Sequence, residues 1–150
     1  MKFAADRMLG KLTKWLRVIG QDVSYGRHLS GHGLVRAARQ ENRIILTRDR
    51  GLRRIHTPEL VFIASNDFRE QLRQVVQEFR LSWRSDLLKR CLACNRLLQP
   101  RSKASVHDMV PEYVFSTQEI FSSCAGCGRI YWPATHHQKM LQELEQLGLN

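Results

Sequence analysis

All four cysteines of this 150-residue chain fall in two CxxC pairs, with 29 residues between the pairs. They are Cys91, Cys94, Cys124 and Cys127. This spacing is typical of a closed zinc site with four thiolates, which leaves no open position for catalysis. Asn95 and Gly128 follow the two pairs, and both residue types tolerate the left-handed backbone that a tight metal-binding turn needs. We therefore predict structural Zn²⁺; iron in the same tetrahedron or a redox pair are the alternatives.

Three aspartates, Asp6, Asp49 and Asp67, each come just after a segment that is predicted to be a buried strand. In a parallel sheet these positions share the carboxyl edge, where α/β proteins place their sites. Clustered carboxylates suit Mg²⁺ or Mn²⁺, which activates water and stabilises charge on a phosphodiester. We therefore expect the three aspartates to be catalytic, with Asp6 and Asp49 as Mg²⁺ or Mn²⁺ ligands. Alternatives stay open, because Asp67 could cap a helix and Asp49 could be an ion-paired turn residue beside Arg48 and Arg50.

The net charge of +10 is concentrated in residues 1–54, which hold 13 Lys and Arg against four acids. Arginine outnumbers lysine 18 to 6, and guanidinium groups bind phosphate in a bidentate manner, so the pattern favours a nucleic acid partner. The candidate RNA-binding residues are Arg7, Lys11, Lys14, Arg48, Arg50, Arg53 and Arg54. No apolar run reaches the ~20 residues needed to span a bilayer. Because Asp6 interrupts the N-terminus too early for a signal peptide, we expect a cytoplasmic protein.

Alternating strand and helix patterns must position these side chains. Strands are expected at 2–5, 23–25, 43–47 and 60–64, and helices at 8–19, 32–41 and from Ser65 or Asp67 to about Phe79. This alternation predicts an α/β fold, a parallel sheet with helices on both faces. Near residue 85 the pattern changes, which predicts an α/β domain at 1–85 and a zinc ribbon with a C-terminal helix at 86–150. Within the second domain, Val114-Phe115 and 130–132 are expected to form strands, and the last helix, about 136–147, to pack within the chain or form a weak dimer.

Five segments carry a resemblance to a known family. They are Asp6–Leu12 with Trp15-Leu16-Arg17 and Gly20, Leu46–Arg50, Cys91-x-x-Cys94-Asn95, Val110-Pro111-x-Tyr113-Val114, and Cys124–Trp132. Together they resemble the Mut-seven C-terminal RNase domain family, a PIN-like fold followed by a zinc ribbon, over essentially the whole chain. The resemblance implies a ribonuclease that hydrolyses phosphodiesters with Mg²⁺ or Mn²⁺ on aspartates. Asp6 and Asp49 match the family's acids, and Asp67 is a looser match.

One acid of the family pattern is missing. PIN-like nucleases usually have a carboxylate on the helix after the second strand, but no Asp or Glu lies between Asp22 and Glu41. Glu41 is expected at the far end of that helix, so His28 or His32 would have to substitute, and imidazole suits Mn²⁺ better than Mg²⁺. Two hypotheses follow: a ribonuclease acting on tRNA or another structured RNA, or an RNA-binding protein that has lost cleavage. A scaffold that contacts a protein partner is a third.

Overall fold

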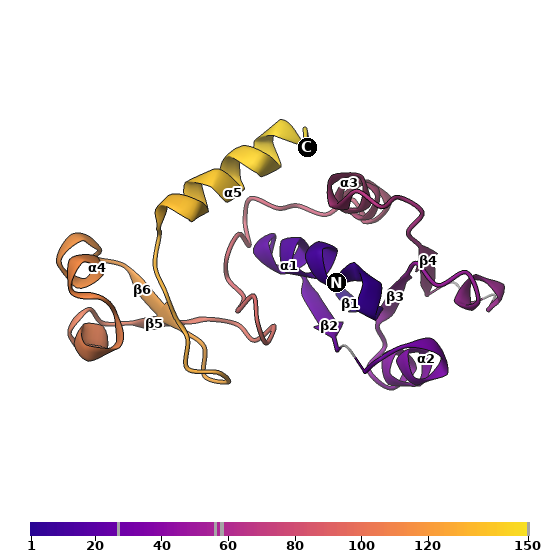
Figure 1. Ribbon diagram of the computed structural model, residues 1–150, viewed down its shortest axis with the longest axis horizontal. Helices are drawn as coiled ribbons and strands as arrows, with labels where there is room; N and C mark the ends of the chain where they lie inside the picture. Colours follow the sequence, from indigo (N-terminus) through magenta and orange to yellow (C-terminus); the bar gives the residue numbers. More distant parts are fainter. Residues whose placement is uncertain (27, 56, 58, 150) are drawn as a thin grey trace. The chain divides into compact units, whose positions relative to one another are not determined.

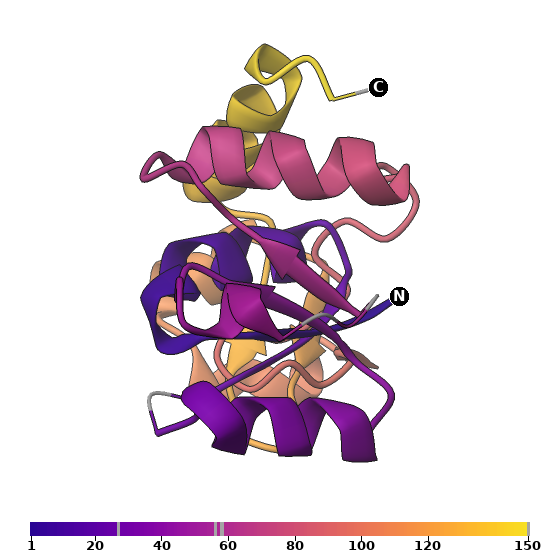
Figure 2. The same cartoon turned by 90° about the vertical axis from the view of Figure 1, so that its right-hand side faces the viewer.

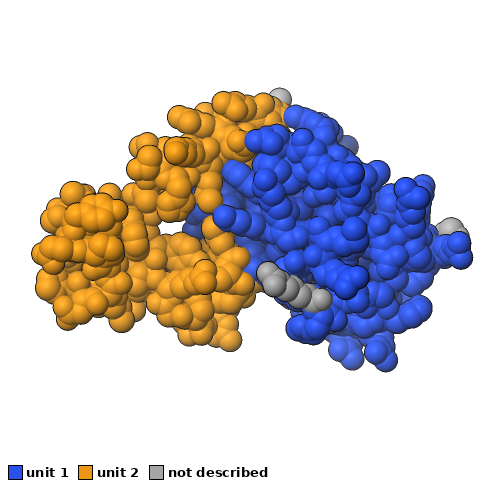
Figure 3. Space-filling model, in the orientation of Figure 1, with its two compact units in different colours: residues 1–88 blue, residues 89–150 orange. Residues whose placement is uncertain are grey.

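The computed structural model describes residues 1–26, 28–55, 57 and 59–149. The chain divides into two compact units, residues 1–88 and 89–150, which are coloured separately in Figure 3. Each unit has its own sheet: a parallel one in the first and an antiparallel one in the second. Each helix in the described part of the chain is too short or too polar to cross a membrane.

The first unit is built on four short parallel strands. They are β1 (Lys2–Ala5), β2 (Asp22–Tyr25), β3 (Ile44–Thr47) and β4 (Leu60–Phe62), in the spatial order β2-β1-β3-β4. Central strands of a parallel sheet are covered on both faces, which is why β1 and β3 are short runs of mostly apolar residues. The expected α/β class with a parallel sheet flanked by helices, followed by a smaller unit of ribbon type, is confirmed.

Helices cover both faces of this sheet. They are α1 (Gly10–Val18), α2 (Gly31–Gln40) and α3 (Phe68–Phe79), with the short 3₁₀ helices η1 (Arg7–Leu9) and η2 (Leu52–Arg54) at strand ends. Ala4 and Ile45 pack under α2, whereas the neighbouring Phe3 points the other way and its ring meets that of Phe79 at 5.3 Å. Successive strand residues therefore supply two cores, with α2 on one face and α1 and α3 on the other (Figure 1, Figure 2).

The strand order places a crevice between β1 and β3. From β1 the chain runs through α1 to β2, then returns through α2 on the opposite face to β3, on the other side of β1. Connections that leave two neighbouring strands toward opposite faces leave a crevice outside the strands' carboxyl ends, where α/β proteins bind ligands. Asp6 directly follows β1 and Asp49 comes two residues after β3, so both acids lie at this crevice.

The second unit holds an antiparallel sheet of order β5-β6-β7. Its elements are β5 (Gln99–Arg101), η3 (Ala104–Met109), α4 (Glu112–Thr117), β6 (Phe121–Ser123), β7 (Ile130–Tyr131) and α5 (Thr135–Gln146). Val106, Val114 and Phe121 form its small core. The expectation of a strand at Val114-Phe115 is wrong, because both residues lie in α4. Pro111, with φ −57°, precedes that helix and already has the helical φ that favours a helix start.

Gly20 permits the close packing of the loop after α1. Its φ is +82°, and a Cβ added there would overlap Asp86, both at Cβ and at the carbonyl oxygen. We predict that Gly20→Ala lowers the free energy of unfolding by about 2 kcal/mol or more, from left-handed strain and the clash. Gly33→Ala is the matched control: nothing lies within 4 Å of its added Cβ, so it should be neutral or raise stability by up to about 1 kcal/mol. Urea unfolding measures both, and an unchanged Gly20→Ala protein would contradict this packing.

Candidate active site and metal centre

The carboxylate of Asp6 is buried and held by three hydrogen bonds. Its side chain is only 3% exposed. Oδ1 accepts the backbone N–H of Met8 at 2.8 Å, and Oδ2 accepts the Thr47 hydroxyl at 2.6 Å and the Arg48 N–H at 2.7 Å. A carboxylate offers about four lone-pair sites, so one remains for a further ligand, on Oδ1.

Thr47, the last residue of β3, connects the two acidic segments. It is fully buried, and its hydroxyl donates to Asp6 while accepting the backbone N–H of Asp49 at 3.0 Å. The backbone adds a second link, since the Asp6 N–H donates to the Leu46 carbonyl at 3.0 Å. The position of Asp49 relative to Asp6 is therefore fixed by one hydroxyl group and by the pairing of β1 with β3.

Asp49 is exposed, and its carboxylate is only partly engaged. Oδ1 accepts the Gly51 N–H at 2.8 Å. Within the described residues, Oδ2 makes no hydrogen bond and no ion pair joins Asp49 to Arg48 or Arg50. The Arg48 guanidinium donates instead to the carbonyl of Ser65. The ion-paired alternative for Asp49 is thus not what the structure shows, and one carboxylate oxygen stays available.

An open cavity of about 450 Å³ lies between these acids. Its walls are Asp6, Arg7, Met8, Ser30, Gly31, Arg48, Asp49 and Arg50. Of the residues expected at a site, the structure therefore brings together two aspartates and three arginines. A concave site that places carboxylates beside guanidinium groups can bind a cation and a phosphate together.

The third aspartate lies elsewhere. Asp67 lines a neighbouring cavity of about 350 Å³, together with Lys11 and Met8, and Met8 also borders the first cavity. Its Oδ1 accepts the Arg69 N–H at 2.8 Å, so Asp67 caps the start of α3. The remaining candidate RNA-binding residues, Lys14 on α1 and Arg53 and Arg54 in η2, are exposed and line neither cavity.

Neither His28 nor His32 replaces the missing helix acid at the cavity. His28 and His32 are exposed, and the segment before α2 contributes Ser30 and Gly31 to the wall instead. Across the described ranges, no third His, Cys, Asp or Glu brings a ligand atom together with those of Asp6 and Asp49. The sequence did not single out Ser30 as a wall residue, although its position directly before a helix at the carboxyl edge was a usable signal.

Tyr25 and Gly10 position the η1 segment, and no pattern in the sequence indicates this role. The Tyr25 hydroxyl donates to the carbonyl of Arg7 at 3.0 Å. A Cβ on Gly10 would lie 2.9 Å from that hydroxyl oxygen, so a larger residue would displace it. The last residue of β2 thus holds the backbone of a cavity arginine.

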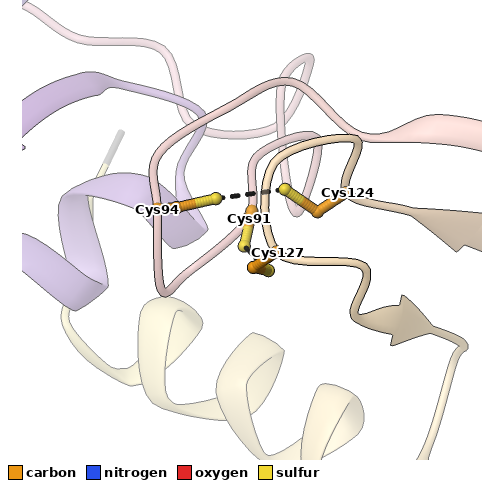
Figure 4. Close-up of side chains that lie close together, drawn as sticks. All are labelled: Cys91, Cys94, Cys124 and Cys127. Atoms are coloured by element: carbon orange, nitrogen blue, oxygen red, sulfur yellow. Dashed lines mark hydrogen bonds between the residues drawn. The ribbon is translucent and has the colours of Figure 1, made fainter.

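In the second unit, the four cysteine sulfurs converge. All four Sγ atoms lie within 4.8 Å of one another; Cys91 and Cys127 are 3.6 Å apart, and Cys94 and Cys124 are 3.0 Å apart (Figure 4). Thiolates bound tetrahedrally to Zn²⁺ at about 2.3 Å would be separated by about 3.8 Å. The cluster therefore fits a metal such as zinc with little movement.

Two matching backbone turns present these sulfurs. Cys91 and Cys124 each donate their N–H to the carbonyl five residues later, at 2.8 and 3.0 Å, and each accepts the N–H four residues later at 2.9 Å. Asn95 and Gly128 both have φ 73°, the left-handed conformation that their residue types favour. The repeated sequence pattern thus produces a repeated turn.

The thiols differ in acidity, which links metal binding to proton release. Burial opposes ionisation of Cys91, but hydrogen bonds from the Tyr131 hydroxyl and from the backbone near Ala93 and Cys94 lower its pKa to about 6. The hydrogen bond with Cys124 raises the pKa of Cys94 to about 12. The Cys94 thiol therefore keeps its proton at neutral pH, and a cation that binds its sulfur must displace that proton.

One comparison with known proteins gave a match. The family model described as the Mut7-C RNAse domain matches residues 1–144. The chain belongs to this family. No curated protein and no solved structure gave a match. The match spans the strand-end acids and the cysteines, so the Mut7-C RNAse domain here includes both the parallel-sheet unit and nearly all of the ribbon unit.

Substitution of one cysteine tests metal binding by the four cysteines of this Mut7-C domain. Because zinc sites of this kind contribute about 10 kcal/mol or more to folding, we predict that Cys124→Ser lowers the bound zinc below one ion per chain. Faster amide exchange in β6 should accompany the loss, while exchange in β1 changes little. Native mass spectrometry and hydrogen exchange measure these effects, with Ser122→Ala as control. A full zinc ion on Cys124→Ser would contradict four-cysteine ligation.

Thr47→Val tests the link between the two acids. The substitution removes one donor from Asp6 and leaves the Asp49 N–H without its acceptor, so the free energy of unfolding should fall by about 1–3 kcal/mol. Thr47→Ser keeps the hydroxyl and should cost less. Urea unfolding of both variants measures the difference; a Val variant that is more stable than the Ser variant would show that the hydroxyl is not needed.

Proposed function

We propose that this chain is a metal-dependent ribonuclease that hydrolyses RNA phosphodiesters in the cavity between Asp6 and Asp49. The observation that carries the proposal is the pairing of a buried carboxylate held by three hydrogen bonds with a second carboxylate that keeps a free oxygen. Both border one open cavity with three arginines. Membership of an RNase domain family supports RNA as the substrate.

Two carboxylates are enough for the cation that such a reaction uses. Mg²⁺ commonly binds proteins through one or two carboxylates and completes its shell with water and substrate phosphate. Oδ1 of Asp6 and Oδ2 of Asp49 are the oxygens with room for this ligand. Bound there, Mg²⁺ or Mn²⁺ would lower the pKa of water and neutralise charge on the phosphate.

The chain's own residues orient the substrate. Arg7, Arg48 and Arg50 border the cavity and can bind phosphate oxygens in a bidentate manner. Thr47 and the backbone of β3 keep Asp6 in one orientation, so little reorganisation is needed when RNA binds. We infer that Lys11, Lys14, Arg53 and Arg54, which lie outside this cavity, bind phosphates of the flanking nucleotides. In this proposal Asp67, the third acid, acts from the neighbouring cavity.

The second candidate function is RNA binding without cleavage. It is favoured by one observation: within the described part of the chain, no third carboxylate converges on Asp6 and Asp49. A site that lost catalysis would keep the basic surface, and RNA would then bind without turnover. The two candidates share a partner, RNA, and differ in chemistry alone.

Asp49→Asn separates these functions most cleanly. Asparagine keeps an Oδ1 for the Gly51 N–H, so the turn is preserved while the charge is lost. Asp6→Asn is a poorer test, because both oxygens of Asp6 accept hydrogen bonds and an amide NH₂ would face a donor. Loss of a cation ligand costs several kcal/mol of transition-state stabilisation, so we predict that Asp49→Asn lowers kcat about 100-fold or more. Cleavage of end-labelled RNA with Mn²⁺ or Mg²⁺ measures it.

Two further variants complete this test, one as a control and one for the third acid. Asp108→Asn changes an exposed carboxylate of the second unit and should cleave as the unchanged protein does. Asp67→Asn reports whether the third acid takes part. Equal activity of Asp49→Asn and the unchanged protein would exclude this cavity. Absence of cleavage with every divalent ion, combined with log affinity that falls by about 0.7 per phosphate contact per log unit of salt, would establish the binding function instead.

A further inference from the structure

The second unit contains a cavity of about 380 Å³ that neither the cysteine cluster nor the acidic site uses. It is bordered by α4, by the segment after β7 and by the first turn of α5. Pockets of at least about 300 Å³ are large enough for small organic ligands. The position within one compact unit means that its shape depends on that unit alone.

Aromatic side chains form part of the cavity wall. Tyr113 of α4 is 71% exposed, although a tyrosine ring gains free energy when it is covered. Trp132 is half-buried and packs on Phe121 with ring centroids 6.5 Å apart, so its indole is supported from the core. An exposed ring and a supported ring in one cavity are suited to stacking with a planar heteroaromatic group.

Polar side chains in the same wall lack partners. In the described residues, the side-chain amides of Gln118 and Gln138 and the hydroxyl of Thr135 make no hydrogen bond. An amide carries both donors and an acceptor, as the edge of a nucleobase does. His137 also lines the cavity; burial and the nearby His136 lower its pKa, so its ring is neutral at neutral pH.

The charge around the cavity suits a phosphate. The described wall contains no acidic side chain, and the first turn of α5 has none. The residue before α5 is Ala134, whose side chain cannot cap the helix, so the partial positive charge of the helix start is not offset there. Glu119, next to Gln118 in the chain, is paired with Lys103 at 2.7 Å.

We propose that this cavity binds one unpaired nucleotide of an RNA strand. The base lies against Tyr113 and Trp132, its edge meets the amides of Gln118 and Gln138, and its phosphate lies near the start of α5. This goes beyond the proposed nuclease and depends on it only for RNA as the ligand. A proline-rich peptide can also dock on aromatic side chains, but its proline residues offer carbonyl acceptors and no N–H donors. It would leave the amide oxygens of Gln118 and Gln138 without a donor and bring no negative charge to the helix start.

The test compares two strands and three proteins. Full-length, zinc-loaded Asp49→Asn protein, which does not cleave under the proposal above, is titrated without added divalent ions against labelled octaadenylate and an abasic strand of equal length. Stacking of one base on an aromatic ring accounts for roughly a tenfold change in affinity. Adding Tyr113→Ala should weaken octaadenylate binding about tenfold and leave the abasic strand unchanged, whereas Tyr113→Phe keeps the ring and the affinity. Fluorescence anisotropy measures each.

Crosslinking provides an independent readout. A strand with 5-iodouridine at each position should crosslink to Tyr113 or Trp132, as mapped by mass spectrometry. The proposal is overturned if Tyr113→Ala weakens the binding of both strands equally or of neither. It is also overturned if decaproline binds the cavity and RNA does not, so that no crosslink to Tyr113 or Trp132 forms. If the base-dependent loss appears in the Asp49→Asn background but the unchanged protein cleaves no RNA with Mn²⁺ or Mg²⁺, the nuclease is refuted and this inference stands. If the unchanged protein cleaves RNA and the base-dependent loss is absent, this inference is refuted and the nuclease stands.

Discussion

A buried carboxylate organises the first unit. Asp6 is removed from water, and a buried charge is tolerated only where hydrogen bonds replace its hydration. Its donors come from two places: the Met8 N–H in the turn after β1, and Thr47 and Arg48 at the end of β3. The carboxylate therefore requires β1 and β3 to be neighbours in the observed register, in which Ala5 pairs with Leu46. Strand order and acidic site are consequences of one constraint.

The sequence predicted that Asp6 and Asp49 lie at one edge of the sheet because the rules are local and directional. Short apolar strands that are followed within two residues by Asp6 or Asp49 have only one sheet edge on which to place those acids. The direction in which a side chain points at that edge cannot be predicted from the residues beside it in the sequence. Asp67 also follows a strand, yet its carboxylate caps α3 through the Arg69 N–H and borders another cavity. Pattern alone could not separate an aspartate that borders the cavity between β1 and β3 from one that lies in a neighbouring cavity.

In the second unit too, some features follow from neighbouring residues in the sequence, and others depend on contacts between residues far apart in the chain. Asn95 and Gly128 have the left-handed backbone that the CxxC pattern implied, since each turn closes within six residues. Val114-Phe115 was misread because a pair of apolar residues fits a strand and a helix equally well. The hydroxyl of Tyr131 lies 3.1 Å from the Cys91 sulfur, 40 residues away in the chain. Such a contact depends on the packed hairpins and has no signature in either cysteine motif.

The acid count and the basic wall have to be considered together. Three arginines and two aspartates border the cavity between Asp6 and Asp49, so its side chains carry more positive than negative charge before any cation enters. In the proposed nuclease, such a site attracts phosphate readily and holds Mg²⁺ or Mn²⁺ weakly on its own. A bound phosphate reverses that balance, since it offsets guanidinium charge and adds oxygen ligands. Cation and RNA would then bind cooperatively, and by thermodynamic linkage each would raise the affinity of the other by the same factor. A third carboxylate would weaken this dependence, but among the described residues none converges on Asp6 and Asp49. In the proposed nuclease the cation would therefore bind tightly only when RNA is bound.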